Sequence, residues 1–114
     1  MATKDEVESF LKYFHESMPT LSIRFSDSNN ESLQTLLKFE ISINHRRDII
    51  NSLNTINYVE GPINDISNEA TIWIFGYSIK GGEIQIKISY CKCGSGILRI
   101  SITEAKHKIK YPFK

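Results

Sequence analysis

The last third of the chain alternates between apolar and polar residues, and this pattern constrains the fold more than any other feature. The alternation runs through residues 83–90 and again through 97–103. A period of two is typical of β-strands that bury one face and expose the other. Residues 71–80 are apolar on both faces, which predicts a central strand. The positions that we expect on one shared core face are Trp73, Phe75, Tyr77, Ile79, Ile84, Ile86, Ile88, Leu98, Ile100 and Ile102.

Glycine-rich turns separate these strands and set their expected register. Gly81-Gly82 predicts a two-residue hairpin loop, which places Gly76 opposite Lys87. In this register Gly76 leaves open space beside the Lys87 ammonium group. Gly94-Ser95-Gly96 predicts a three-residue loop, because an odd length lets all three strands share the core face. The second hairpin then pairs Lys87 with Thr103, Ser89 with Ser101, and Cys91 with Arg99.

Helical signals lie before these strands. Thr3 and Glu6 have the spacing of a capping box, and apolar residues then recur at helical intervals over 7–14. A short second helix is expected over 31–38. A third is expected from Asn44, a residue type that can cap a helix, to Leu53.

The remaining segments complete the predicted fold. Residues 21–25 alternate and predict a short strand, whereas 54–69 are polar, contain Gly61-Pro62, and are predicted to form a loop. The expected fold class is therefore α+β, with about three helices packed on an antiparallel β-sheet. A length of 114 residues fits a single domain over residues 1–114.

Charge is distributed unevenly along the chain. Residues 1–70 hold eleven acidic and six basic residues, whereas 71–114 hold eight basic residues and only two acidic ones, Glu83 and Glu104. A basic sheet on a chain with a net charge of +1 indicates a local site for a polyanion, with RNA as the first candidate. The alternative is that lysines on edge strands prevent edge-to-edge pairing.

One face of the predicted sheet collects polar and basic side chains, with Glu83 at its rim as its only carboxylate. Lys87 and Arg99 can hold phosphates, while Gln85 and the hydroxyl groups position the bound chain. The alternative is an ordinary solvated outer face of an antiparallel sheet. The residues assigned to this face are Ser78, Gln85, Lys87, Ser89, Arg99, Ser101 and Thr103.

The last eight residues are basic and carry two aromatic residues, Tyr111 and Phe113. Such a tail can form a flexible arm that binds a polyanion. The aromatic residues favour instead a tail that docks on the body of the protein.

No motif indicates a metal or another cofactor. Cys91-x-Cys93 lacks the usual zinc spacing and a second pair, so two inert thiols are expected rather than a zinc site. The first ten residues contain no apolar stretch, and the longest apolar run, 72–76, is too short to span a membrane. These features predict a cytoplasmic protein without a membrane partner.

Several short motifs resemble those of a known family. They are Asn57-Tyr58-x-Glu60-Gly61-Pro62, Trp73-x-Phe75-Gly76 and the closing Tyr111-Pro112-Phe113-Lys114. Over about residues 30–114 the chain resembles small bacterial toxins of type II toxin–antitoxin modules, namely the MqsR family within the RelE-like ribonuclease fold. The resemblance implies an mRNA endonuclease that needs no metal, acts on free or ribosome-bound mRNA, and is held inactive by a cognate antitoxin protein.

The resemblance also implies an active site on the open sheet face. Lys87 would stabilise the phosphorane, Arg99 would grip a phosphate, Gln85 would orient the 2′-hydroxyl or the scissile phosphate, and His107 would act as acid or base. The expected RNA-binding residues are Lys87, Arg99, Ser89, Ser101, Thr103, Lys108, Lys110 and Lys114.

Two positions depart from the family pattern. The family has Tyr where this chain has Gln85 and His where it has Thr103, and neither replacement exchanges a proton near neutral pH. The alternative function is therefore a catalytically silent relative that binds RNA or a protein partner without cleavage. A structural module with no nucleic-acid role is a third alternative.

Overall fold

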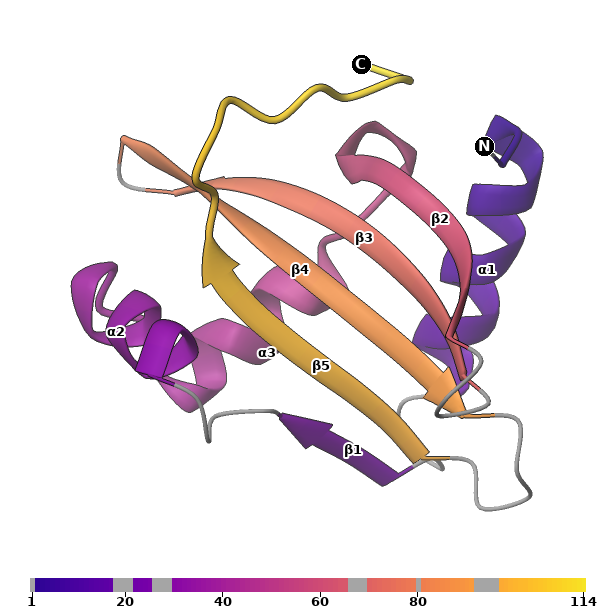
Figure 1. Cartoon of the computed structure of the whole chain (residues 1–114). Coiled ribbons are helices and arrows are strands. Elements are labelled where there is room, and N and C mark those ends of the chain that lie inside the picture. The colour runs from indigo at the N-terminus through magenta and orange to yellow at the C-terminus, as the bar shows by residue number, and fades with distance from the viewer. Residues whose placement is uncertain (1, 18–21, 26–29, 66–69, 80, 92–96) are drawn as a thin grey trace.

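The computed structural model describes residues 2–17, 22–25, 30–65, 70–79, 81–91 and 97–114 (Figure 1). Within these residues the fold is α+β, as predicted, with three α-helices and a five-stranded sheet. The helices are α1 (Lys4–Ser17), α2 (Asn30–Lys38) and α3 (Ile43–Asn51), with a short 3-10 helix η1 (Thr55–Asn57). The strands are β1 (Ser22–Phe25), β2 (Tyr58–Asp65), β3 (Ala70–Ile79), β4 (Gly82–Cys91) and β5 (Ile97–Glu104).

The sheet has the strand order β1-β5-β4-β3-β2. Strands β2 to β5 form an antiparallel meander, which agrees with the predicted antiparallel sheet. Strand β1 differs because it runs parallel to β5. A parallel neighbour requires a long crossover connection. Here the chain between β1 and β5 contains both short helices and the rest of the sheet.

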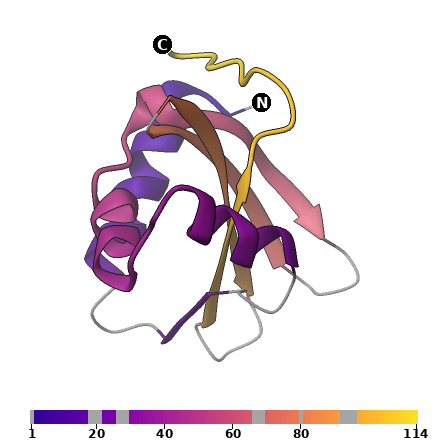
Figure 2. The same cartoon turned by 90° about the vertical axis from the view of Figure 1, so that its left-hand side faces the viewer.

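The helices leave one sheet face largely uncovered. Figure 2 shows α1 and α3 on the same side of the sheet, which we call the core face. Helix α2 lies beside β5, where the Thr35 hydroxyl accepts a hydrogen bond from the backbone N–H of Glu104 at 2.8 Å. On the opposite side, which we call the outer face, the described part of the chain places only the C-terminal tail (residues 105–114), at one end (Figures 1 and 2).

The alternating residues bury their apolar side chains on the core face, as predicted. Ile84, Ile86 and Ile88 are completely buried. Trp73 belongs to the same core, where its ring stacks on Phe10 of α1 with centroids 4.3 Å apart. The face assignment from sequence is therefore confirmed for the described core residues.

Helix starts follow from local hydrogen bonds. Thr3 and Glu6 form the expected capping box, with each side chain accepting a hydrogen bond from the other residue's backbone N–H. The prediction that Asn44 caps the third helix is wrong. Ser42 is the N-cap of α3, because its extended backbone lets its hydroxyl accept from the N–H of His45 at 3.1 Å.

The segment predicted as a loop before the sheet is largely strand β2. Pairing with β3 shifts register on either side of Glu60, and the second irregularity, between Glu60 and Ile63, contains Gly61-Pro62. Because β2 is an edge strand, a proline without an N–H is tolerated there. The polar composition of the segment therefore reflects the exposed edge of a sheet rather than a loop.

The predicted hairpin register is wrong by two residues. Ile79 pairs with Gly82, so the turn lies one position earlier in the chain than the predicted Gly81-Gly82 turn. As a result, Gly76 faces Gln85 instead of Lys87. In the observed register Gly82 lies against the Phe39 ring, which a Cβ at this position would approach to 2.9 Å. The β4–β5 pairing is shifted by two residues as well. An even shift keeps every side chain on its predicted face. The proposed loop at residues 94–96 lies outside the described residues.

Candidate nucleic-acid interface

Six polar or basic side chains lie in three cross-strand pairs on the outer face, where β4 runs beside β5. Lys87 and Arg99 are exposed, and neither has a hydrogen-bond or ion-pair partner among the described residues. Directly opposed side chains of antiparallel strands have Cβ atoms about 5 Å apart. Each cation therefore has a hydroxyl-bearing neighbour. The pairs are Lys87 with Ser101, Ser89 with Arg99, and Gln85 with Thr103.

These pairs replace those predicted from the turns, in which Lys87 faced Thr103. The tertiary register instead puts an amide beside a hydroxyl and each cation beside a serine. On the other side of β5, Arg24 of β1 is the backbone partner of Arg99. We call the three pairs along β4 and β5 the basic strip. Two arginine positions therefore occur on neighbouring strands at one end of the basic strip.

The outer face is less free of carboxylates than predicted. Exposed Glu60 of β2 pairs with Ile74, and Ile74 in turn pairs with Lys87. Glu60 therefore occupies the same cross-sheet row as Lys87, two strands or about 10 Å away. This distance is close to the screening length at physiological salt, so Glu60 weakens the positive potential at Lys87 only modestly. The prediction missed this carboxylate because it treated β2 as a loop.

The C-terminal tail docks on the body of the protein, as its aromatic residues predict. Phe113 stacks on the buried core residue Tyr58 with ring centroids 5.4 Å apart, and the residues before it lie on the outer face. Tyr111 and Ile109 lie directly over Gly76, where an added Cβ would meet their side chains at 2.7–2.9 Å. The predicted open space at Gly76 is therefore filled by the tail. Glycine is required at this position for close approach between the strand and the tail.

The Glu83 carboxylate accepts two hydrogen bonds from the docked tail. The Tyr111 hydroxyl donates to Oε2 of Glu83 at 2.8 Å, and the backbone N–H of Ile109 donates to Oε1 at 3.3 Å. Burial first, and then the Glu83 carboxylate, raise the pKa of Tyr111 to about 12. A tyrosine is protonated at neutral pH even at its ordinary pKa, and this shift extends that range, so Tyr111 acts as a hydrogen-bond donor here.

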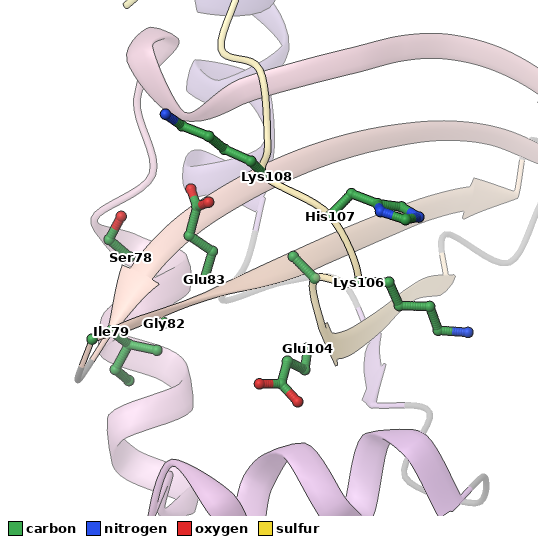
Figure 3. Close-up of a pocket in the computed structure, with 10 residues that line it drawn as sticks. Ser78, Ile79, Gly82, Glu83, Glu104, Lys106, His107 and Lys108 are labelled. Atoms are coloured by element: carbon green, nitrogen blue, oxygen red, sulfur yellow. The ribbon is translucent and has the colours of Figure 1, made fainter.

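A groove of about 650 Å³ lies at the end of the sheet beside this contact (Figure 3). In Figure 3, Lys106 and His107 point to one side of the tail and Lys108 points to the other. Glu104, which also lines the groove, forms an ion pair of 2.5 Å with Lys38. The lining residues include Ser78, Ile79, Gly82, Glu83, Glu104, Lys106, His107 and Lys108.

His107 lies beyond the end of β5, and no hydrogen bond joins it to the other described residues of the interface. The other two histidines belong to helices on the core face, where His15 hydrogen-bonds the backbone oxygen of Ile50. His107 is thus the histidine on the side of the basic strip. Lys108 and Lys110 are exposed in the tail, and the ammonium group of Lys114 lies 5.0 Å from the centre of the Tyr111 ring.

The contact between Glu83 and Tyr111 was not predicted from the sequence. The sequence places Glu83 only at the rim of the face and Tyr111 only in a tail that docks on the body. The one available signal was Gly76, since a glycine inside a central strand indicates close approach of another part of the structure. That signal does not identify the partner, which lies 35 residues further along the chain.

No group of three or more His, Cys, Asp or Glu residues in the described ranges is arranged to hold a metal ion. The expectation for Cys91 and Cys93 concerns side chains outside the described part. Across the described residues, every helix is too short or too polar to traverse a bilayer.

Comparison with known proteins found no matching family model, curated protein or solved structure. The fold and the interface therefore define a class only in structural terms. The chain is an α+β protein whose five-stranded sheet presents a basic, hydroxyl-rich strip along β4 and β5 on its outer face.

Proposed function

We propose that this chain is the toxin of a type II toxin–antitoxin module and acts as a metal-independent mRNA endonuclease. The observation that best supports this proposal is the pair of exposed cations, Lys87 and Arg99, on a sheet face that none of the described helices covers. Phosphate groups bind such cations, and neighbouring serine hydroxyls add hydrogen bonds to phosphate or ribose oxygens. This arrangement suits a single RNA strand lying across β4 and β5.

The proposed reaction moves the RNA 2′-hydroxyl onto the adjacent phosphorus. The bond from phosphorus to the 5′-oxygen breaks, one proton leaves the 2′-oxygen, and one proton is delivered to the departing 5′-oxygen. Lys87 would stabilise the charge on the phosphorane, and Arg99 would hold a flanking phosphate. Gln85 would orient the 2′-hydroxyl or the scissile phosphate, and His107 would exchange a proton as acid or base.

Ser89, Ser101, Thr103, Lys108, Lys110 and Lys114 would extend the RNA contacts. We place this activity in the cytoplasm, with mRNA, free or on the ribosome, as substrate. A cognate antitoxin would inhibit it by covering the outer face. An acidic segment of such a partner would compete with RNA for Lys87 and Arg99.

A second function is favoured by the groups around Lys87. Gln85 and Thr103 form the neighbouring pair, and neither exchanges a proton near neutral pH. The Tyr111 phenol donates its proton to a hydrogen bond with Glu83, and burial together with that carboxylate raises its pKa to about 12. These features favour a catalytically silent relative that binds RNA or a protein partner without cleaving RNA.

The test is induced expression in a bacterial host, with growth and new mRNA 5′ ends followed over time. The toxin proposal expects growth arrest and discrete new ends, both lost in Lys87→Ala. Lys12→Ala is the matched control, because Lys12 is an exposed lysine on α1, which packs on the core face. Normal growth and intact mRNA with soluble, folded protein would contradict the endonuclease.

Binding measurements separate the two functions. Both expect affinity for single-stranded RNA to fall as salt rises. Lys87→Ala should reduce the slope of log affinity against log salt by about 0.7 to 1. The silent relative expects this binding without cleavage. Affinity that does not change with salt would contradict both.

A further inference from the structure

We infer that Glu83 is a positioning residue that closes the tail into a fixed loop and thereby holds His107 at the end of the basic strip. This inference rests on the proposed function, in which His107 exchanges a proton with RNA. It adds a role for a carboxylate whose charge is unfavourable on a phosphate-binding face.

Glu83 holds the tail at three points. Its backbone oxygen accepts from the N–H of Ala105 at 3.0 Å. Its two carboxylate oxygens accept from the N–H of Ile109 and the hydroxyl of Tyr111. One residue at the start of β4 therefore fixes the tail before His107 and again after it. Residues 106–108 become a short loop with both ends anchored.

The tail is anchored a second time by packing. The side chains of Ile109 and Tyr111 occupy the space above Gly76 on the interior strand β3, and Phe113 stacks on Tyr58. These contacts restrict how far the loop can move when it is released from Glu83. Because the loop is short and its ends are fixed, few conformations remain for His107 to lose when RNA binds.

The chemistry of a carboxylate explains why glutamate occupies this position. Each oxygen of a carboxylate accepts from a different donor, and charged hydrogen bonds are stronger than neutral ones. Glutamine has nearly the same shape but offers only one oxygen acceptor. A glutamine at position 83 would therefore leave one of the two tail donors without its acceptor.

The experiment compares Glu83→Gln, Tyr111→Phe and Glu104→Gln with the wild type. Glu104→Gln is the matched control, because it removes one carboxylate from the same groove but the Glu104 side chain pairs with Lys38 rather than with the tail. Tyr111→Phe removes one tail contact without changing charge. Backbone hydrogen exchange at Ile109 and the NMR signals of the His107 ring report on the loop. Cleavage of a short single-stranded RNA reports kcat and KM separately.

Glu83→Gln is expected to speed exchange at Ile109 and to change the His107 ring signals, while Glu104→Gln leaves both as in the wild type. Glu83→Gln should lower kcat by about 10- to 100-fold, with KM changed by less than about twofold. Tyr111→Phe should change both readouts in the same direction by a smaller factor. Glu104→Gln should keep kcat near the wild-type value.

Three other results are possible, and each would contradict either the inference or the proposed function. Unchanged exchange at Ile109 in Glu83→Gln would overturn the inference without touching the proposed function. Faster exchange with an unchanged kcat would show that Glu83 holds the loop but does not position His107, which also overturns the inference. A wild type that cleaves no RNA would contradict the proposed endonuclease itself and remove the catalytic role of the loop.

Discussion

The phenol of Tyr111 donates a hydrogen bond to the carboxylate of Glu83, with 2.8 Å between the two oxygens. This contact joins the last residues of the chain to the start of β4 and closes the tail over Gly76. It occupies one end of the outer face and leaves the Lys87–Ser101 and Ser89–Arg99 pairs as the accessible part of the basic strip.

The Tyr111 contact should make stability depend on pH in alkaline solution. The folded protein raises the Tyr111 pKa from 10.0 to about 12, so the folded state holds this proton more tightly than the unfolded state. The resulting stabilisation is fully present below pH 10.0 and is lost as pH rises through about 12. A two-unit shift corresponds to about 2.7 kcal/mol, and partial exposure of the ring reduces our expectation to about 1 kcal/mol.

Urea unfolding of the wild type and Tyr111→Phe on both sides of this pH range measures the effect. The difference in their free energies of unfolding should shrink by about 1 kcal/mol as pH rises. The comparison between variants cancels the titration of other tyrosines and of lysines. A folded-state Tyr111 that titrates at its ordinary pKa would contradict the prediction.

Gly76→Ala should release the tail while leaving the sheet intact. The new methyl group would meet Tyr111 and Ile109 at 2.7–2.9 Å, and these are side-chain ends in the tail rather than sheet backbone. The tail should therefore move, at a cost of about 1 kcal/mol in stability. Limited trypsin digestion followed by mass spectrometry should show faster cleavage after Lys110.

Gly81→Ala is the control for Gly76→Ala. Gly81 has φ +80 with open space around it, so alanine there strains the turn by about 1–2 kcal/mol without meeting the tail. It should lower the melting temperature with no change in cleavage after Lys110. Equal tail cleavage in the two variants would show that general destabilisation, rather than the clash, releases the tail.

Thr35→Val should destabilise the edge of β5 beside α2. Thr35 is only 3% exposed, and its hydroxyl accepts from the N–H of Glu104 at 2.8 Å. Valine has nearly the same shape but leaves this donor without its acceptor, which costs about 1–3 kcal/mol. Thr35→Ser retains the hydroxyl and should cost less. Chemical denaturation of the two variants checks the order, which would be reversed if methyl packing mattered more than the hydrogen bond.

Phe10→Ala should weaken the packing of α1 on the sheet. Phe10 stacks on Trp73 and also lines a partly open apolar pocket of about 360 Å³ between α1 and the strands, so truncation removes the stacking and widens this pocket. We expect a loss of about 3 kcal/mol. Trp73 is the single tryptophan of the chain, so its fluorescence should change with the substitution. Leu37→Ala is the control, since Leu37 is 79% exposed and should change stability by less than about 0.5 kcal/mol.

Strand faces were predictable because they depend only on alternation. Ile84, Ile86 and Ile88 are buried although the predicted pairing was wrong, since a shift of two residues leaves faces unchanged. The neighbours of Lys87 were not predictable from the turns. They depend on where the strands pair around Gly82, and that pairing accommodates the Phe39 ring from a distant part of the chain.

Strand β2 is a second feature that local sequence patterns did not predict. Its sequence is polar and contains Gly61-Pro62, so local rules predict a loop. Eight residues nevertheless form a strand because β3 offers an open edge that satisfies their backbone groups. This strand also brings Glu60 onto the outer face, which changes the charge of the candidate interface.

The sequence by itself determined the fold class, the helix signals, the buried face of the sheet and the concentration of basic residues in the last third. These properties arise from capping, periodicity and composition, which act over a few neighbouring residues. Only the tertiary structure decided the strand register, the role of β2 and the docking of the tail on Glu83 and Gly76. Those features depend on side chains that meet across long sequence separations, and no local pattern specifies which partners fit together.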